Sequence, residues 1–268
     1  MPLLRWLMRT GGGLLVLGLT LGLTPGTVAL ALGLPEAQHR ADLHLALAVH
    51  YFQADQNAVA LEEVDQSLLA QPQNAEAHSL RGVIEWRLHH AVSATASFQT
   101  SLALQPNNLL VLQNAAWWQC QQGQADAAQP YFDAALAQSV GDSVLRLWLA
   151  RAACQRQAGQ NGAAQASYLQ VLALAERRPP AQEAGQLTRQ RWVWEAHRAL
   201  AEIMAGDGDF VSASPYIRQV NESGWADAAT LWLGVRIERG LGRPDADDEW
   251  LDRLHRQFPQ AREPAPPF

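Results

Sequence analysis

The feature that most constrains the fold of this chain is a repeat of 34 residues near its N-terminus. Residues 41–74 align without a gap with residues 75–108, and both units end in Gln-Pro-x-Asn, with Pro72 and Pro106 at the same place. Because proline lacks an amide hydrogen and restricts the residue before it, each unit ends a helix there. A repeat with a period of this size indicates a stack of supersecondary units.

Small and large residues recur at fixed positions in the two units. A small residue lies in the first half, alanine opens the second half, and a larger apolar residue follows four positions later: Ala48, Ala60 and Val64, then Gly82, Ala94 and Phe98. This pattern is typical of tetratricopeptide repeats (TPRs), in which two helices approach closely at the small residues. The chain is therefore predicted to be all-α, a right-handed TPR superhelix in which each repeat covers the apolar face of its neighbour.

The same pattern extends the predicted TPR domain over residues 41–260, with about six repeats. The third and fourth units occupy about 109–142 and 145–178, and two degenerate units begin near Trp194 and Leu231.

Two segments depart from the period. The spacing from Gly159 to Gly208 exceeds one TPR period by roughly 15 residues, which predicts an insertion near 177–194. We expect either a longer first helix in the fifth repeat or a surface excursion there. Residues 261–268 contain three prolines and are predicted to form a disordered tail.

Residues 1–31 have the pattern of an export signal. Arg5 and Arg9 precede an uncharged, leucine-rich run, and the small-x-small sequence at 29–31 is typical of a cleavage site. Glycines and a Thr-Pro-Gly turn shorten the apolar run, which favours a cleaved signal peptide. The alternative is an uncleaved anchor, because the uncharged stretch is just long enough to cross a bilayer. Residues 32–40 are expected to link this segment to the repeats, which lie outside the cytoplasm in either case.

The two cysteines, Cys120 and Cys154, fall on predicted helices of adjacent repeats. Outside the cytoplasm they are free to form a disulfide. Pairing needs Cα atoms within about 7 Å, whereas packed helix axes usually lie about 8–10 Å apart, so two buried free thiols are the favoured interpretation.

The inner wall of a TPR superhelix is lined by one stripe of each first helix. In this register the first three repeats place six apolar residues on that stripe: Leu45, Val49, Phe52, Val83, Trp86 and Trp117. Such a stripe predicts a groove that binds a helix or an extended segment of another protein. The competing interpretation is that residues 32–40, or a C-terminal helix, fold over this wall and make it core.

Charge and motifs argue against other functions. A formal net charge of -6 argues against nucleic-acid binding. His89 and His90 lie at a predicted turn without further ligands at metal spacing, so we expect no metal site and no cofactor. The acidic run at 245–252 fits the first turn of a helix, and the Gly-Asp-Gly-Asp at 206–209 fits a turn between helices. Since no catalytic arrangement stands out, we predict that the chain is not an enzyme.

Beyond the general TPR pattern, four strings carry a more specific resemblance. They are Leu-Gln-Asn at 112–114, Cys-Gln-Gln-Gly-Gln at 120–124, Leu-Trp-Leu-Gly-Val-Arg-Ile-Glu-Arg at 231–239 and Arg-Gln-Phe-Pro at 256–259. With them, the chain from Asp42 onward resembles the PilF/PilW type IV pilus biogenesis and stability proteins. This resemblance implies a six-TPR pilotin that helps secretin subunits of the pilus pore to reach the outer membrane and multimerise.

The resemblance implies a type IV pilus secretin as partner, with other pilus assembly proteins as further candidates, and a periplasmic, outer-membrane-associated location. Members of that family end their signal with a lipobox cysteine, whereas no cysteine precedes Cys120 here. A lipid anchor is therefore not expected, and membrane association would depend on the N-terminal segment. The alternatives are a periplasmic TPR scaffold for another envelope complex, such as cytochrome maturation or polysaccharide export, and a TPR domain that regulates an enzyme.

Overall fold

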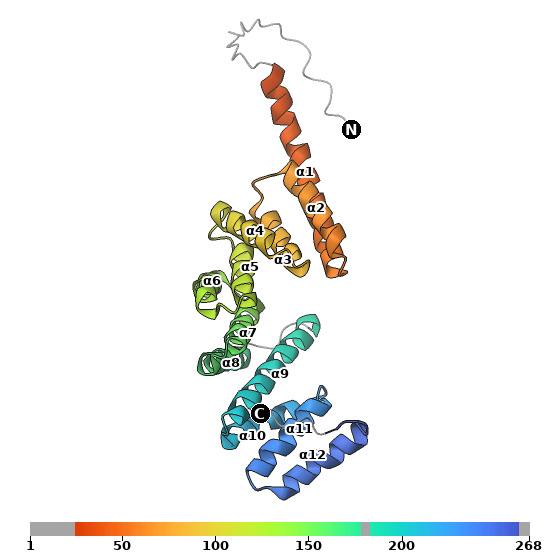
Figure 1. Cartoon of the computed structure of the whole chain (residues 1–268), viewed down its shortest axis with the longest axis vertical. Coiled ribbons are helices and arrows are strands. Elements are labelled where there is room, and N and C mark those ends of the chain that lie inside the picture. Colours follow the sequence, from red (N-terminus) through yellow and green to blue (C-terminus); the bar gives the residue numbers. More distant parts are fainter. Residues whose placement is uncertain (1–24, 178–182, 263–268) are drawn as a thin grey trace, which may run out of the picture.

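The computed structural model describes residues 25–177 and 183–262, and in these residues every regular element is an α-helix. The helices form antiparallel pairs that stack along a curved, elongated molecule (Figure 1). Their bounds are α1 Pro25–Gln53, α2 Asn57–Ala70, α3 Ala75–Arg87, α4 Ala91–Leu104, α5 Leu109–Gln121, α6 Ala125–Gln138, α7 Asp142–Gln157, α8 Asn161–Glu176, α9 Glu183–Gly206, α10 Phe210–Glu222, α11 Ala228–Gly240 and α12 Pro244–Gln257. The predicted all-α repeat architecture is confirmed.

The turns between paired helices identify six repeats. Each turn contains one residue with positive φ: Asp55, His89, Gly123, Gly159, Gly208 and Gly242. In the second repeat the amide of His90 donates to the carbonyl of Glu85 and the amide of His89 donates to that of Trp86. The other five turns repeat this pair of bonds, which is the Schellman arrangement that ends a helix at a left-handed residue. The degenerate fifth and sixth repeats thus keep the same turn as the first four.

Small residues bring the two helices of a repeat together, as the sequence pattern predicts. A Cβ atom added to Gly82 would lie 2.9 Å from the ring of Phe98, so only glycine fits at that contact. The equivalent Ala48 and the second-helix residues Ala60 and Ala94 are fully buried.

Asparagine at the end of the Gln-Pro-x-Asn sequence begins the next repeat. The side chain of Asn74 accepts a hydrogen bond from the amide of Ala77 at 3.1 Å. Asn108 accepts bonds from the amides of Leu110 and Val111 at 2.9 and 3.2 Å. Both are N-caps that satisfy amides left free in the first turn of a helix.

The first helix is longer than one repeat requires. α1 has 29 residues and its partner α2 has 14, so the N-terminal half of α1 projects beyond the first repeat (Figure 1). Residues 32–40, expected to be a linker, belong to this continuous helix. Most of the predicted signal lies outside the described residues. Within the described residues, no helix has the length and apolarity that a bilayer span requires.

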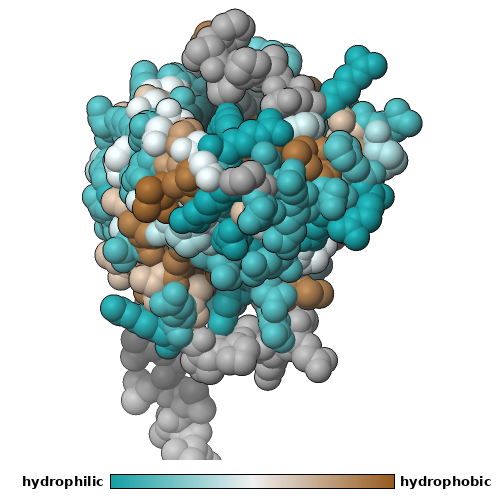
Figure 2. All heavy atoms as spheres, turned by 90° about the horizontal axis from the view of Figure 1, so that it is seen from below, coloured by the Kyte–Doolittle hydropathy of each residue, from teal (hydrophilic) through white to brown (hydrophobic). Residues whose placement is uncertain are grey.

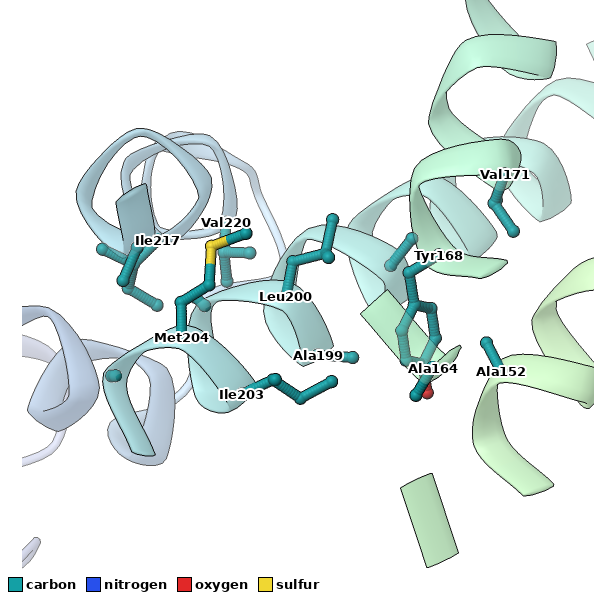
Figure 3. Packing of buried hydrophobic residues seen from close by; sticks show 14 of the residues in the cluster. Ala152, Ala164, Tyr168, Val171, Ala199, Leu200, Ile203, Met204, Ile217 and Val220 are labelled. Carbon is teal, nitrogen blue, oxygen red and sulfur yellow. The ribbon is translucent and has the colours of Figure 1, made fainter. Parts of the chain in front are cut away.

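The insertion near 177–194 lengthens α9 to 24 residues, which is the longer first helix that was one of the two expectations. Figure 3 shows Leu200 and Met204 of α9 on the side of Ile217 and Val220, and Ile203 on the side of Tyr168. These residues belong to one buried cluster that joins α7, α8, α9 and α10. The insertion therefore leaves the stacking of repeats four and five intact.

The cysteines are paired, so the favoured interpretation as free thiols is wrong. Cys120 of α5 and Cys154 of α7 form a disulfide with their Cα atoms 5.3 Å apart. The Cα atoms of a helix lie about 2.3 Å from its axis, so facing residues of helices about 8–10 Å apart approach to roughly 3.5–5.5 Å. The prediction from the distance between helix axes therefore underestimated how closely the two Cα atoms can approach.

The last helix presents a polar surface. The exposed residues of α12 include Asp245, Asp248, Glu249 and Asp252. Viewed from below in Figure 2, the surface is mostly hydrophilic, with smaller hydrophobic areas. A polar outer face is what a terminal repeat needs, because no further repeat covers it.

Candidate protein-binding surfaces

Three of the six residues predicted to line the groove lie together between the second and third repeats. Val83, Trp86 and Trp117 are half-buried and pack against a small core that includes Phe98 and Trp118. The ring of Phe98 stacks on that of Trp118 at a centroid distance of 5.3 Å and lies 6.4 Å from that of Trp117. Trp86 and Trp117 are therefore held in place by this core and keep part of their surface exposed.

The residues of the first repeat form a second group. Leu45 and Phe52 are half-buried against the core between repeats one and two, whereas Val49 is 38% exposed. The guanidinium of Arg87 lies over the ring of Phe52 at 5.4 Å and pairs with Asp55 at 3.5 Å. A cation over an aromatic ring is stabilising, and here it partly covers Phe52. The structure thus brings the six residues into two neighbouring groups.

The alternative in which this wall is covered by the chain itself does not hold for the described residues. Residues 32–40 continue α1 and cannot fold back onto it, and Glu36, Gln38, His39 and Arg40 are exposed. The last helix, α12, packs against α11 at the other end of the molecule (Figure 1). We call the two groups together the aromatic face, which comprises Leu45, Val49, Phe52, Val83, Trp86 and Trp117. That a protein binds this face is a prediction.

Sequence reasoning missed a cleft in the C-terminal half. It has a volume of about 810 Å³ and lies between α8, α9 and the loop from α10 to α11. Its lining includes Leu172, Ala175, Val193, Trp194 and Trp225. The signal in the sequence that could have predicted this cleft was the insertion, since the added turns of α9 form one wall of the cleft.

The polar groups of the cleft are mostly uncharged. His197 lies beside Tyr216, with ring centroids 5.7 Å apart, and burial lowers the pKa of its imidazole against the opposing effect of Glu176. His197 is therefore neutral near pH 7. Trp194 is covered on one side by Arg198, whose guanidinium lies 5.6 Å from the ring centroid and pairs with Glu202 at 3.1 Å.

The local motifs that suggested other chemistry have structural roles. His89 and His90 are exposed at the turn between α3 and α4. Residues 206–209 form the turn from α9 to α10, where Asp209 is the N-cap and accepts from the amide of Ser212. In the acidic run, Asp247 pairs with Arg239 at 2.8 Å in the first turn of α12. The described residues contain no group of three or more ligands suited to a metal ion.

The paired helices, the six Schellman turns and the stacked small residues define a tetratricopeptide-repeat protein, the class to which this chain belongs by fold. No family model matches the sequence, and no curated protein matches it.

Among solved structures, PilW, a widely conserved type IV pilus biogenesis factor, is 24% identical, with a TM-score of 0.65 over 83% of this chain and 96% of PilW. PilF of Pseudomonas aeruginosa is 19% identical, with the same TM-score over 85% of this chain and 95% of PilF. YrrB, a TPR protein with an unusual peptide-binding site, is 15% identical, with a TM-score of 0.51 over 76% of this chain and 96% of YrrB. The fold of this chain is therefore like those of PilW and PilF over nearly the whole length of each of those two proteins.

Proposed function

We propose that this protein assists type IV pilus biogenesis by binding the pilus secretin outside the cytoplasm and helping it to reach the outer membrane and multimerise. The observation that carries this proposal is the likeness to PilW and PilF, which extends over 96% and 95% of those chains. A TPR superhelix acts through protein binding, and its extended concave surface suits that role.

The disulfide supports a location outside the cytoplasm. Disulfides persist in the periplasm and other oxidising compartments, whereas cytosolic thiols are kept reduced. The pair Cys120–Cys154 joins two repeats of the stack, so it forms part of the folded domain. Together with the charge pattern of residues 1–31, it favours an exported protein.

The aromatic face of the first three repeats is the surface that we assign to the secretin. Large, partly exposed aromatic residues backed by a packed core commonly dominate the energy of protein binding. Trp86 and Trp117 meet this description, and Phe52 extends the surface toward the N-terminus.

The test is a pulldown of secretin from envelope extracts with the full chain and with a Phe52→Ala, Trp86→Ala, Trp117→Ala variant. Loss of secretin with the variant supports the role and the face together. A matched control replaces three exposed apolar residues outside the face, Leu69, Val92 and Val211, with alanine and is expected to retain secretin.

A second variant guards against loss of structure. Val49 is 38% exposed and belongs to none of the core clusters, so Val49→Asp should weaken binding without unfolding the first repeat. Circular dichroism checks that every variant stays helical. Recovery of a different envelope protein would instead favour the general scaffold, and equal recovery of secretin by all variants would contradict the assignment of this face.

A further inference from the structure

The C-terminal cleft is an addition to the TPR scaffold. The first helices of repeats two to four have 13 to 16 residues, whereas α9 has 24. The N-terminal turns of α9 leave Leu187 66% exposed, and across the cleft Trp225 is 40% exposed. Exposed apolar surface that lines a cleft indicates a binding site more often than it indicates packing.

An ion pair holds the added turns of α9 in place. Arg189 donates to the carboxylate of Asp142, at the start of α7, at 2.6 Å, and its side chain is only 13% exposed. The wall that carries Leu187 is thereby tied to the fourth repeat. A wall that is ordered before binding lowers the conformational entropy lost when a ligand enters.

The lining matches a peptide segment. Much of its lining is apolar, and three glutamines, Gln186, Gln190 and Gln219, contribute side-chain amides. An amide side chain offers both a donor and an acceptor, as does each peptide unit of an extended backbone. The two tryptophans provide flat apolar surface for one large side chain.

The charges favour a basic residue in that segment. Of the two ionised residues lining the cleft, Arg189 is engaged with Asp142, which leaves the exposed Glu176 on the α8 side. Arg191 is absent from the lining of the cleft and lines an adjoining hollow of about 490 Å³, which shares Leu187, Trp194 and Trp225 with it. The formal net charge of -6 adds a general attraction for basic segments.

We propose that the cleft between α8, α9 and the α10–α11 loop binds an extended segment of a partner protein. One large apolar or aromatic side chain lies against Trp194 and Trp225, and a Lys or Arg lies beside Glu176. This second site is separate from the aromatic face of the first three repeats, so it goes beyond the proposed function and does not depend on it.

The experiment is a binding screen of the labelled full chain against an immobilised array of short random peptides. The expected result is enrichment of peptides that combine Trp, Phe or Leu with a nearby Lys or Arg. Trp225→Ala is expected to weaken the best peptides about tenfold or more, as loss of an aromatic anchor does. Glu176→Arg should shift the selection from basic to acidic peptides, which a structural role for Glu176 would not produce.

Val211→Ala is the matched control, because Val211 is 72% exposed on α10 and is absent from the lining of the cleft. It should leave the selection unchanged, as should the triple variant of the aromatic face. Equal binding by the native chain and Trp225→Ala would overturn the proposal, and so would enriched peptides without a basic residue. Binding that emerges only after removal of residues 263–268 would assign the cleft to the chain's own tail instead.

Discussion

Cys120 and Cys154 lie at the contact between α5 and α7 and join the third repeat to the fourth, with their Cα atoms 5.3 Å apart. Both side chains are buried, at 7% and 6% exposure, within a cluster that also contains Phe132 and Leu147. The disulfide therefore closes a loop of one repeat inside a packed core at the middle of the superhelix. It is a covalent link in a stack whose other contacts between repeats are non-covalent, such as the ion pair between Arg189 and Asp142.

Reduction of this disulfide is expected to destabilise the domain by about 3–4 kcal/mol, because the cross-link restricts the unfolded chain over a loop of this length. Urea unfolding with and without reductant measures the change in midpoint. A Cys120→Ser, Cys154→Ser variant should unfold at the midpoint of the reduced protein and be insensitive to reductant. Identical midpoints for the oxidised and reduced native chain would contradict the prediction.

His89 has φ of 63° at a turn where four of the other repeats have glycine. A non-glycine residue in this region costs about 1 kcal/mol, so His89→Gly is expected to stabilise the domain by about 0.5–1 kcal/mol. The reverse change, Gly123→Ala at φ 72°, should destabilise it, although no atom would clash with the added Cβ. Thermal unfolding of the two variants should give shifts of opposite sign, and shifts of the same sign would exclude this explanation.

Asn108 accepts two amides of the first turn of α5, so Asn108→Ala should lower stability by about 1 kcal/mol. Asn108→Ser serves as the control, because serine also caps helices and introduces no charge beside Glu76, so it should be nearly neutral. Chemical denaturation measures both. A loss with Ser as large as that with Ala would point to the hydrogen bonds from Asn108 to Glu76 and Gln105 as the cause instead.

The lowered pKa of His197 predicts an acid-sensitive contribution to stability. Between the unfolded pKa near 6.5 and the lower folded pKa, the unfolded chain binds more protons than the folded chain. Stability from this residue is thus full above the unfolded pKa and falls as pH drops through it toward the folded pKa. His197→Gln should lose less stability than the native chain between pH 7 and pH 5, measured by urea midpoints, and parallel losses in both proteins would refute this assignment.

The sequence by itself determined the repeat architecture, because that information is local and periodic. Each repeat contains its own small residues for the helix contact and its own turn, and the first two repeats end at equivalent prolines, so a spacing of 34 residues implies the stack. The insertion was predictable for the same reason, as a break in the period. The register of the first three repeats also predicted that Trp86 and Trp117 lie on neighbouring first helices, and the structure brings both against one core.

The tertiary structure alone decided what depends on how the repeats approach one another. The pairing of Cys120 with Cys154 required the facing sides of α5 and α7 to be known, since a distance between axes does not give a distance between Cα atoms. The division of the six candidate residues into two groups follows from the core that five of them contact, with Val49 on the same helix as Leu45 and Phe52. The cleft arises from three segments far apart in the sequence, α8, α9 and the α10–α11 loop, and no periodic pattern encodes a concavity formed by such segments.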